Sequence, residues 1–254
     1  MTVGRPDGPG RVWTAVSGDG SGPRIILIHG SLDRSAGLLR LARRLDTGHR
    51  VVRYDRRGYG RSHRLDGPYD VRAHLDDLAS LLDRTPTVLF GHSFGGALAL
   101  AAAIELAPTI TGVAVYEPPM VWEPWWPRAS NEDHGDPEDL AEAFMRRLIG
   151  DQRWDRLGAA TRRARRAEGP ALVAELESLG RDWCWDLGAV RCPVLVMRGA
   201  LAREHHQRAT DEIVASCRDA NLVVVEGAGH FGPNTHPADV AVALGDFAPV
   251  SAVR

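Results

Sequence analysis

The stretch that most constrains the fold of this chain is V-L-F-G-H-S-F-G-G-A-L-A-L, at positions 88–100. Its first part is an apolar run typical of a buried strand, and its last part is a small-residue segment that favours a helix. Because only Gly91, His92 and Ser93 separate the two parts, the chain must turn sharply from strand to helix. We expect such a turn to strain the backbone of Ser93 and to project its hydroxyl from the edge of a sheet.

The rest of the chain alternates short β-branched runs with segments of helical periodicity. The predicted strands are Val12–Val16, Arg24–His29, Arg50–Tyr54, Thr87–Phe90, Gly112–Tyr116, Val194–Met197 and Leu222–Val225. The predicted helices between them are Ala36–Leu45, Val71–Leu82, Phe94–Ala107 and Arg208–Cys217. This alternation predicts an α/β fold with a mostly parallel central sheet flanked by helices. In such sheets the reactive groups gather in loops beyond the carboxyl ends of the strands.

The interval 118–190 breaks the alternation. It contains no convincing strand pattern, only helical patterns such as Pro137–Ile149 and Pro170–Leu179. Six of the seven tryptophans fall in it, namely Trp122, Trp125, Trp126, Trp154, Trp183 and Trp185. We therefore predict a core formed by 1–117 and 191–254, with 118–190 inserted as a helical cap, or lid.

Composition excludes several classes of protein. A chain of 254 residues with 44% hydrophobic residues can form one large core, and a net charge of −2 gives no indication of nucleic acid as a partner. The three cysteines lack the spacing of a metal or redox motif, and a small odd number suits a reducing compartment. No signal-peptide core is present at 1–10, and the longest apolar run, 97–107, is too short to span a bilayer. We expect a cytoplasmic protein with no membrane partner.

Three further loops resemble those of one known superfamily. Gly91-His92-Ser93-Phe94-Gly95 is a G-x-S-x-G motif, His29-Gly30-Ser31 follows the strand I-I-L-I, Tyr54–Ser62 reads Y-D-R-R-G-Y-G-R-S, and Gly227–Phe231 reads G-A-G-H-F. Together they resemble the α/β-hydrolase superfamily of serine hydrolases with a helical cap, over nearly the whole chain. The resemblance is specific to the fold and not to a substrate. It implies a serine nucleophile, Ser93, and chemistry without a cofactor or a metal.

A serine hydroxyl needs a neighbouring base to take its proton. His230 lies in a glycine-rich loop after the last predicted strand and comes last in the chain order of this fold, so we predict it as the base. We interpret His92 as structural, and we expect no metal at His205-His206 because no other ligands accompany that pair.

The resemblance also implies two donors for the negative charge that develops on an attacked carbonyl. By motif position these are the backbone N–H groups of Ser31 and Phe94. The Ser31 hydroxyl is either an additional contact or an ordinary turn residue. For Asp55 we predict a role in holding its own loop, with its charge met by neighbouring arginines.

The acidic partner of His230 is less plainly marked. Most members of the superfamily carry it after the strand that reads P-V-L-V-M-R-G here, but the expected position holds Ala202, and Glu204 comes two residues later. Some members carry it after the strand that follows the elbow helix, where this chain has Glu117, 24 residues beyond Ser93. A carboxylate at the end of a buried strand needs a partner. We predict that Glu117 pairs with His230; the alternatives are Glu204 as the acid and Glu117 as a salt-bridge anchor for the cap.

These residues predict a cofactor-free enzyme acting on a small-molecule substrate. Trp122, Trp125 and Trp126 directly follow the predicted catalytic strand, so they could line an apolar pocket, although at least half of the tryptophans in 118–190 should pack within the cap. We predict hydrolysis of a small or medium, apolar or aromatic, ester or thioester through an acyl-enzyme. Carbon–carbon bond hydrolysis, lactone opening and acyl transfer or cyclisation use the same triad. A non-catalytic ligand-binding protein of the same fold is the alternative from another class.

Overall fold

A seven-stranded sheet forms the centre of the molecule. The computed structural model describes residues 10–20, 22–106, 108–127 and 135–248. The strands are β1 (Thr14–Ser17), β2 (Arg24–Ile28), β3 (Val51–Tyr54), β4 (Thr87–His92), β5 (Ile110–Tyr116), β6 (Val194–Gly199) and β7 (Ala220–Val225). Their order is β1-β3-β2-β4-β5-β6-β7, and only the β1–β3 pair is antiparallel. The predicted mostly parallel sheet is confirmed.

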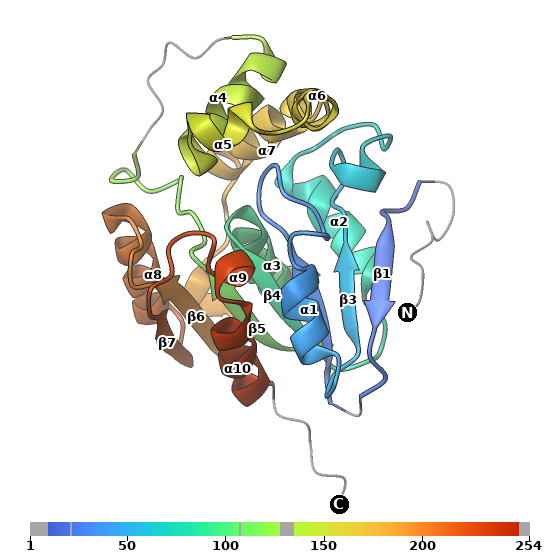
Figure 1. Cartoon of the computed structure of the whole chain (residues 1–254). Coiled ribbons are helices and arrows are strands. Elements are labelled where there is room, and N and C mark those ends of the chain that lie inside the picture. Colours follow the sequence, from blue (N-terminus) through green and yellow to red (C-terminus); the bar gives the residue numbers. More distant parts are fainter. Residues whose placement is uncertain (1–9, 21, 107, 128–134, 249–254) are drawn as a thin grey trace, which may run out of the picture.

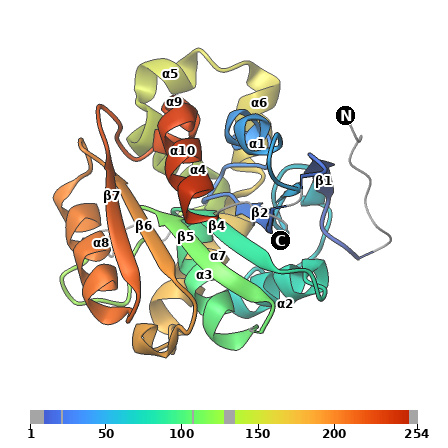
Figure 2. The same cartoon turned by 90° about the horizontal axis from the view of Figure 1, so that it is seen from below.

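Helices cover both faces of this sheet. They are α1 (Leu39–Leu45), α2 (Val71–Leu81), α3 (Phe94–Glu105), α8 (Glu204–Ser216), α9 (Gly232–Thr235) and α10 (Pro237–Phe247), with the short 3-10 helices η1 (Gly60–Ser62) and η2 (Leu187–Ala189). Figures 1 and 2 show α1 and α10 on one face and α2, α3 and α8 on the other.

Strand β2 shows how the sequence builds these two layers. Ile25 and Leu27 belong to the core formed with α1 and α10, whereas Ile26 and Ile28 belong to the core formed with α2 and α3. All four side chains are fully buried. Because side chains alternate between the faces of a strand, a continuous apolar run is what a strand covered on both sides requires.

The turn between β4 and α3 depends on glycine. A Cβ at Gly91 would lie 2.1 Å from the carbonyl oxygen of Gly95, and a Cβ at Gly95 would lie 2.4 Å from the carbonyl oxygen of Ile28. Neither distance is possible for real atoms, so only glycine lets the strand, the turn and the neighbouring strand approach so closely. The same closeness brings the loop after β2 next to the turn.

Between β5 and β6, in the interval predicted as the cap, the described residues form four α-helices, followed by η2. They are α4 (Pro137–Ile149), α5 (Asp151–Asp155), α6 (Ala159–Arg166) and α7 (Gly169–Arg181), and the described residues of 118–190 include no strand. Figure 1 shows them together above the ends of the sheet strands. We call residues 118–190 the cap segment.

The sequence predicted most of these elements closely, but not all of them. Helix α8 begins at Glu204, four residues before the predicted start, and α10 was missed. Helix α3 ends at Glu105, and the predicted last residue, Ala107, lies outside the described residues, as do 1–9 of the predicted core and 128–134 of the predicted cap. In the part of the chain that the structure describes, no helix combines the length and apolar character needed to cross a membrane.

Candidate active site

Ser93 occupies the turn between β4 and α3. Its backbone has φ 53° and ψ −125°, a conformation that residues with a side chain rarely adopt. Its N–H donates to the carbonyl of Tyr116 at 2.9 Å, and its own carbonyl accepts from the N–H of Gly96 at 2.7 Å. The first contact ties the turn to β5 and the second begins α3. These contacts hold a partly exposed serine in a strained position, as expected from the turn sequence.

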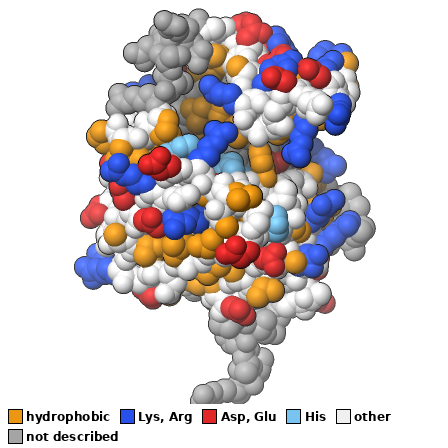
Figure 3. Space-filling view, turned by 60° about the vertical axis from the view of Figure 1, so that its left-hand side comes forward, with side chains coloured by type: hydrophobic (Ala, Val, Ile, Leu, Met, Phe, Trp, Pro, Cys, Tyr) orange, Lys and Arg blue, Asp and Glu red, His pale blue; other side chains and the backbone are white. Residues whose placement is uncertain are grey.

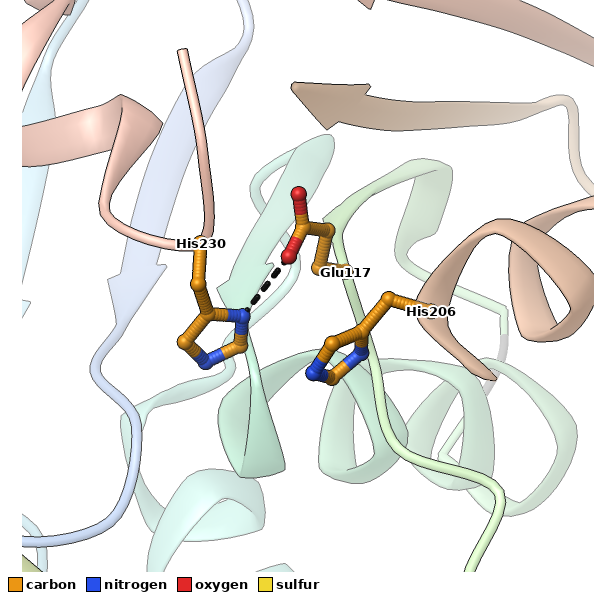
Figure 4. A group of neighbouring side chains, drawn as sticks. All are labelled: Glu117, His206 and His230. Carbon is orange, nitrogen blue, oxygen red and sulfur yellow. Dashed lines mark hydrogen bonds and ion pairs between the residues drawn. The ribbon is translucent and has the colours of Figure 1, made fainter. Parts of the chain in front are cut away.

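Glu117 is the residue that follows β5, and it is fully buried. Its φ is 44°, so the strand bends sharply at this point. One carboxylate oxygen, Oε1, accepts from the N–H of Gly199 at 3.0 Å, and the other, Oε2, lies 2.8 Å from Nδ1 of His230. Figure 4 shows the carboxylate pointing at the His230 ring. Both oxygens have partners, which is what a buried carboxylate requires.

His230 lies between β7 and α9 and keeps 20% of its side chain exposed. Two side chains from the centre of the sheet hold its loop. Nε2 of His92 lies 2.7 Å from the carbonyl oxygen of His230, and the Tyr116 hydroxyl donates to the carbonyl of Gly229 at 2.9 Å. Burial, followed by the neighbouring His230, lowers the pKa of His92 to about 3. His92 therefore stays neutral and braces the backbone of this loop.

His206, at the start of α8, is the functional candidate that the sequence reasoning missed. Its ring stacks on that of His230 at a centroid distance of 4.6 Å and an angle of 23°, and Trp126 lies edge-to-face against it at a centroid distance of 5.2 Å. Burial is the main reason why the pKa of His206 is lowered to about 2, and the nearby His230 contributes to the shift. Its ring is therefore a neutral surface against His230. A signal was present, since His206 is one helical turn beyond Ala202, the position where the family's acid is expected.

The sequence indicated no other ligands beside His205 and His206, whereas the structure places two possible ligands next to His206. Donor atoms of Glu117, His206 and His230 all lie within 4.8 Å of one another (Figure 4). The arrangement nevertheless suits a hydrogen-bonded pair better than a metal. Glu117 Oε2 is already hydrogen-bonded to His230. The rings of His206 and His230 are nearly parallel, so their nitrogen lone pairs point side by side, whereas the ligands of one ion must converge on it.

Glu204, the alternative acid, is exposed at the first residue of α8. Among the described residues it makes no hydrogen bond to His230. The helix begins earlier than predicted, which turns Glu204 outward and brings His206 inward. The geometry thus brings together His230 and Glu117 and leaves Glu204 outside.

The three tryptophans predicted to line a pocket have different surroundings. Trp122 stacks on Trp183 at 3.7 Å with parallel rings, and Trp125 lies 4.3 Å from the Arg208 guanidinium carbon. Only Trp126 touches a ring that in turn touches His230. In the space-filling view of Figure 3, hydrophobic and histidine side chains reach the surface between the helices at the top and the core below.

The loop after β2 passes directly against the serine turn. A Cβ at Gly30 would lie 3.0 Å from Cβ of Ser93 and 3.2 Å from the carbonyl oxygen of His92. Phe94 is the first residue of α3, so its N–H has no partner within the helix. The backbone N–H groups of Ser31 and Phe94 thus belong to two segments that meet beside Ser93.

The prediction for Asp55 was right about the loop and wrong about the partners. Its two carboxylate oxygens accept from the backbone N–H groups of Ser35 at 2.8 Å and Arg61 at 2.9 Å, not from arginine side chains. A short aspartate in a tight turn reaches nearby amides more easily than it reaches the ends of long side chains. The adjacent Arg57 is paired with Asp77 instead, at 2.6 and 2.7 Å.

Comparisons with known proteins agree with this fold. Residues 25–244 match the model of the alpha/beta hydrolase family. The 2-(acetamidomethylene)succinate hydrolase of Mesorhizobium japonicum is 26% identical, over 94% of this chain and 92% of its own length. The polyketide synthase ThaQ of Burkholderia thailandensis is 28% identical over 93% of this chain, which spans only 12% of that protein. An alpha/beta hydrolase from Sphaerobacter thermophilus superimposes with a TM-score of 0.73 and 27% identity, over 96% of this chain and 100% of its own. The chain therefore belongs to the alpha/beta hydrolase family and is a hydrolase.

Proposed function

We propose that this protein cleaves carboxylic esters or thioesters through an acyl-enzyme formed on Ser93. The observation that carries the proposal is the 2.8 Å contact between Oε2 of Glu117 and Nδ1 of His230. A carboxylate at Nδ1 keeps the proton on that nitrogen and leaves the lone pair of Nε2 free to act as a base. It also stabilises the imidazolium that forms when the base takes a proton.

The reaction follows from these roles. His230 Nε2 takes the Ser93 hydroxyl proton as Oγ attacks the acyl carbonyl, and the backbone N–H groups of Ser31 and Phe94 stabilise the oxyanion. Collapse of the tetrahedral adduct breaks the bond to the leaving alcohol or thiol, which takes the proton from His230. Water then attacks the acyl-enzyme in the same way, and the acid product and free Ser93 result. Among the described residues no hydrogen bond joins Ser93 to His230, and such contacts commonly tighten only when substrate is bound.

The substrate class rests on the cap segment. The half-buried Trp126, in contact with His206 beside His230, favours a small or medium acyl group with apolar or aromatic character. The residues 118–190 would act as a lid over the site. One relative is named as a hydrolase of 2-(acetamidomethylene)succinate and another as a polyketide synthase. These names support a small-molecule substrate. Three free cysteines fit work in a reducing cytoplasm.

A fluorophosphonate probe tests the proposal directly. An activated serine should be labelled rapidly in the wild-type protein, and Ser93→Ala should abolish the labelling. A series of p-nitrophenyl esters and acyl-thioesters of increasing chain length should then show turnover with a preference for apolar acyl groups. If the wild-type protein binds such compounds but is neither labelled nor active, it is a ligand-binding member of the fold and the proposal is wrong.

A further inference from the structure

Arg56 is a buried arginine that the proposed reaction does not use. Its Nε donates to the carbonyl of His29 at 3.1 Å, and one terminal nitrogen donates to the carbonyl of Gly30 at 3.1 Å. Its guanidinium carbon also lies 4.5 Å from the centre of the Phe94 ring. One guanidinium therefore contacts both segments whose backbone N–H groups would stabilise the oxyanion.

The contact with the Gly30 carbonyl also affects the Ser31 N–H, because the two groups share one planar peptide unit. The carbonyl of Gly30 and the N–H of Ser31 belong to the same trans peptide unit and point in opposite directions. His29 adds a second donor: its Nε2 accepts from the backbone N–H of Arg56 at 2.9 Å, so its Nδ1 carries the proton and donates to Gly30 O at 2.8 Å. The backbone N–H of Asp33 donates to the same carbonyl at 3.3 Å, so three donors, one of them Arg56, together set the direction of the Ser31 N–H.

Arg56 is itself held from the cap segment. Its other terminal nitrogen donates to Oε2 of Glu175, on α7, at 2.6 Å, and both side chains are 0% exposed. His74 completes the cluster at 3.2 Å from the same Arg56 nitrogen. Burial opposes ionisation of Glu175, but the charge of Arg56 and the bond from His74 prevail and lower its pKa to about 2. Glu175 is therefore a fixed negative charge reaching from the cap segment into the core.

We propose that Glu175 is a positioning residue for the oxyanion hole: through Arg56 it directs the Ser31 N–H, so that the hole is complete only when α7 lies on the core. The inference rests on the proposed function, because it concerns the oxyanion of that reaction. It assigns to the cap segment a role in the chemical step in addition to contact with the substrate.

A neighbouring ion pair provides a matched control. Arg57, the next residue in the chain, makes two bonds to Asp77 of α2, and this pair is also largely buried. Arg57 does not contact the carbonyls of His29 or Gly30 among the described residues. Loss of Asp77 therefore removes a comparable ion pair from the same loop without releasing the Ser31 peptide unit.

The test compares Glu175→Gln with Asp77→Asn on one p-nitrophenyl ester. We expect Glu175→Gln to lower kcat about ten- to a hundredfold, less than the loss of an oxyanion donor itself, with KM within about threefold. Ser93 converts a trifluoromethyl ketone to an anionic tetrahedral adduct. The affinity of the variant for this ketone should fall by the same factor as kcat/KM. The affinity for a non-reactive amide analogue of the substrate should not change. Asp77→Asn should leave all three quantities near wild type.

Glu175→Gln leaves the buried Arg56 charge without its carboxylate partner, so a second variant covers the case in which this one fails to fold. The pair Glu175→Leu and Arg56→Met, made together, replaces the ions by apolar side chains of similar size, an exchange that proteins tolerate well. We expect it to fold and still to lose kcat, since methionine cannot hold the carbonyls of His29 and Gly30.

The outcomes separate this inference from the proposed function. Wild-type kcat and ketone affinity in the folded double variant, or equal effects of Glu175→Gln and Asp77→Asn, would overturn the inference alone. A wild-type protein that neither turns over esters nor reacts with a fluorophosphonate would overturn the proposed function, and the inference with it.

Discussion

Two buried glutamates near the candidate active site can be compared directly. Glu117 and Glu175 are both 0% exposed, but their partners differ. Glu117 contacts a backbone N–H and His230, a group that takes up and releases a proton during the proposed reaction. Glu175 contacts Arg56, which is always charged. The comparison teaches that a buried carboxylate can serve chemistry when its partner changes charge, and serves position when its partner does not.

The largest expected effect is that of Ser93→Ala, which tests the serine mechanism on which this comparison depends. Ser93→Ala should lower kcat by about four powers of ten or more, because the nucleophile is lost and only the oxyanion donors and binding remain. Turnover of a p-nitrophenyl ester by the purified variant measures it, and circular dichroism checks that the fold is intact. Substantial remaining activity would show that Ser93 is not the nucleophile, and Glu117 would then lose its assigned role too.

Glu117→Gln tests the chemical side of the comparison. Glutamine keeps the size of the side chain but cannot stabilise an imidazolium and can hold the ring in the wrong tautomer, so kcat should fall by about two to four powers of ten. Stability should change by only about 1 kcal/mol or less, since the amide oxygen can still accept from the Gly199 N–H. The exposed Glu204→Gln is the control and should keep full activity. The opposite ranking would move the acid to Glu204.

At the other glutamate, the change to glutamine should lower stability more, and kcat less, than it does at Glu117. Glu175→Gln should cost about 3–5 kcal/mol of unfolding free energy, because it strands the Arg56 charge in the interior. Its effect on kcat should be smaller than that of Glu117→Gln. Denaturant unfolding of the two variants side by side measures the stability difference, and equal stabilities would remove the distinction between the two carboxylates.

The neutral ring of His206 predicts a dependence of stability on pH. The pKa of His206 is about 2 in the folded protein, whereas an exposed histidine has a pKa of about 6.5, so below about pH 6.5 the unfolded state binds more protons. The free energy of unfolding should therefore fall as the pH is lowered, by up to about 1.4 kcal/mol per pH unit from this group. His206→Phe keeps an aromatic ring against His230 and should flatten the dependence between pH 6.5 and 4. Exposed His63→Phe serves as the control, and an unchanged slope in His206→Phe would contradict the assigned neutral state.

The smallest effects concern the tryptophans of the cap segment. Trp126→Ala should change the relative kcat/KM for short and long acyl groups by about tenfold, because Trp126 contacts the ring that lies on His230. Trp122→Ala should mainly lower Tm, since its ring is stacked on Trp183. The acyl-ester series with both variants decides this, and equal selectivity profiles would place Trp126 among the packing residues as well.

The core of the fold could be predicted because its signals are local. A run such as Ile25–Ile28 is apolar on both faces of a strand, and α4 spans Pro137–Ile149 as predicted, with Asp136 capping its start and Gly150 following its end. Helix α10 was missed because its buried side chains, chiefly Val240 and Leu244, form too short a stripe to stand out. Only packing against the sheet identifies that stripe as a core face.

For the candidate site, the sequence by itself determined the turn that carries Ser93, the glycine-rich loop of His230 and the strand end that carries Glu117. Each depends on residues next to one another in the chain, whose backbone limits leave few conformations. The tertiary structure alone decided that Glu204 faces outward, that His206 lies on His230 and that Glu175 reaches Arg56 across 119 residues of chain. No local pattern encodes such contacts, because a side chain acquires its partner only when separate elements pack together, and a shift of one helical turn would give it another.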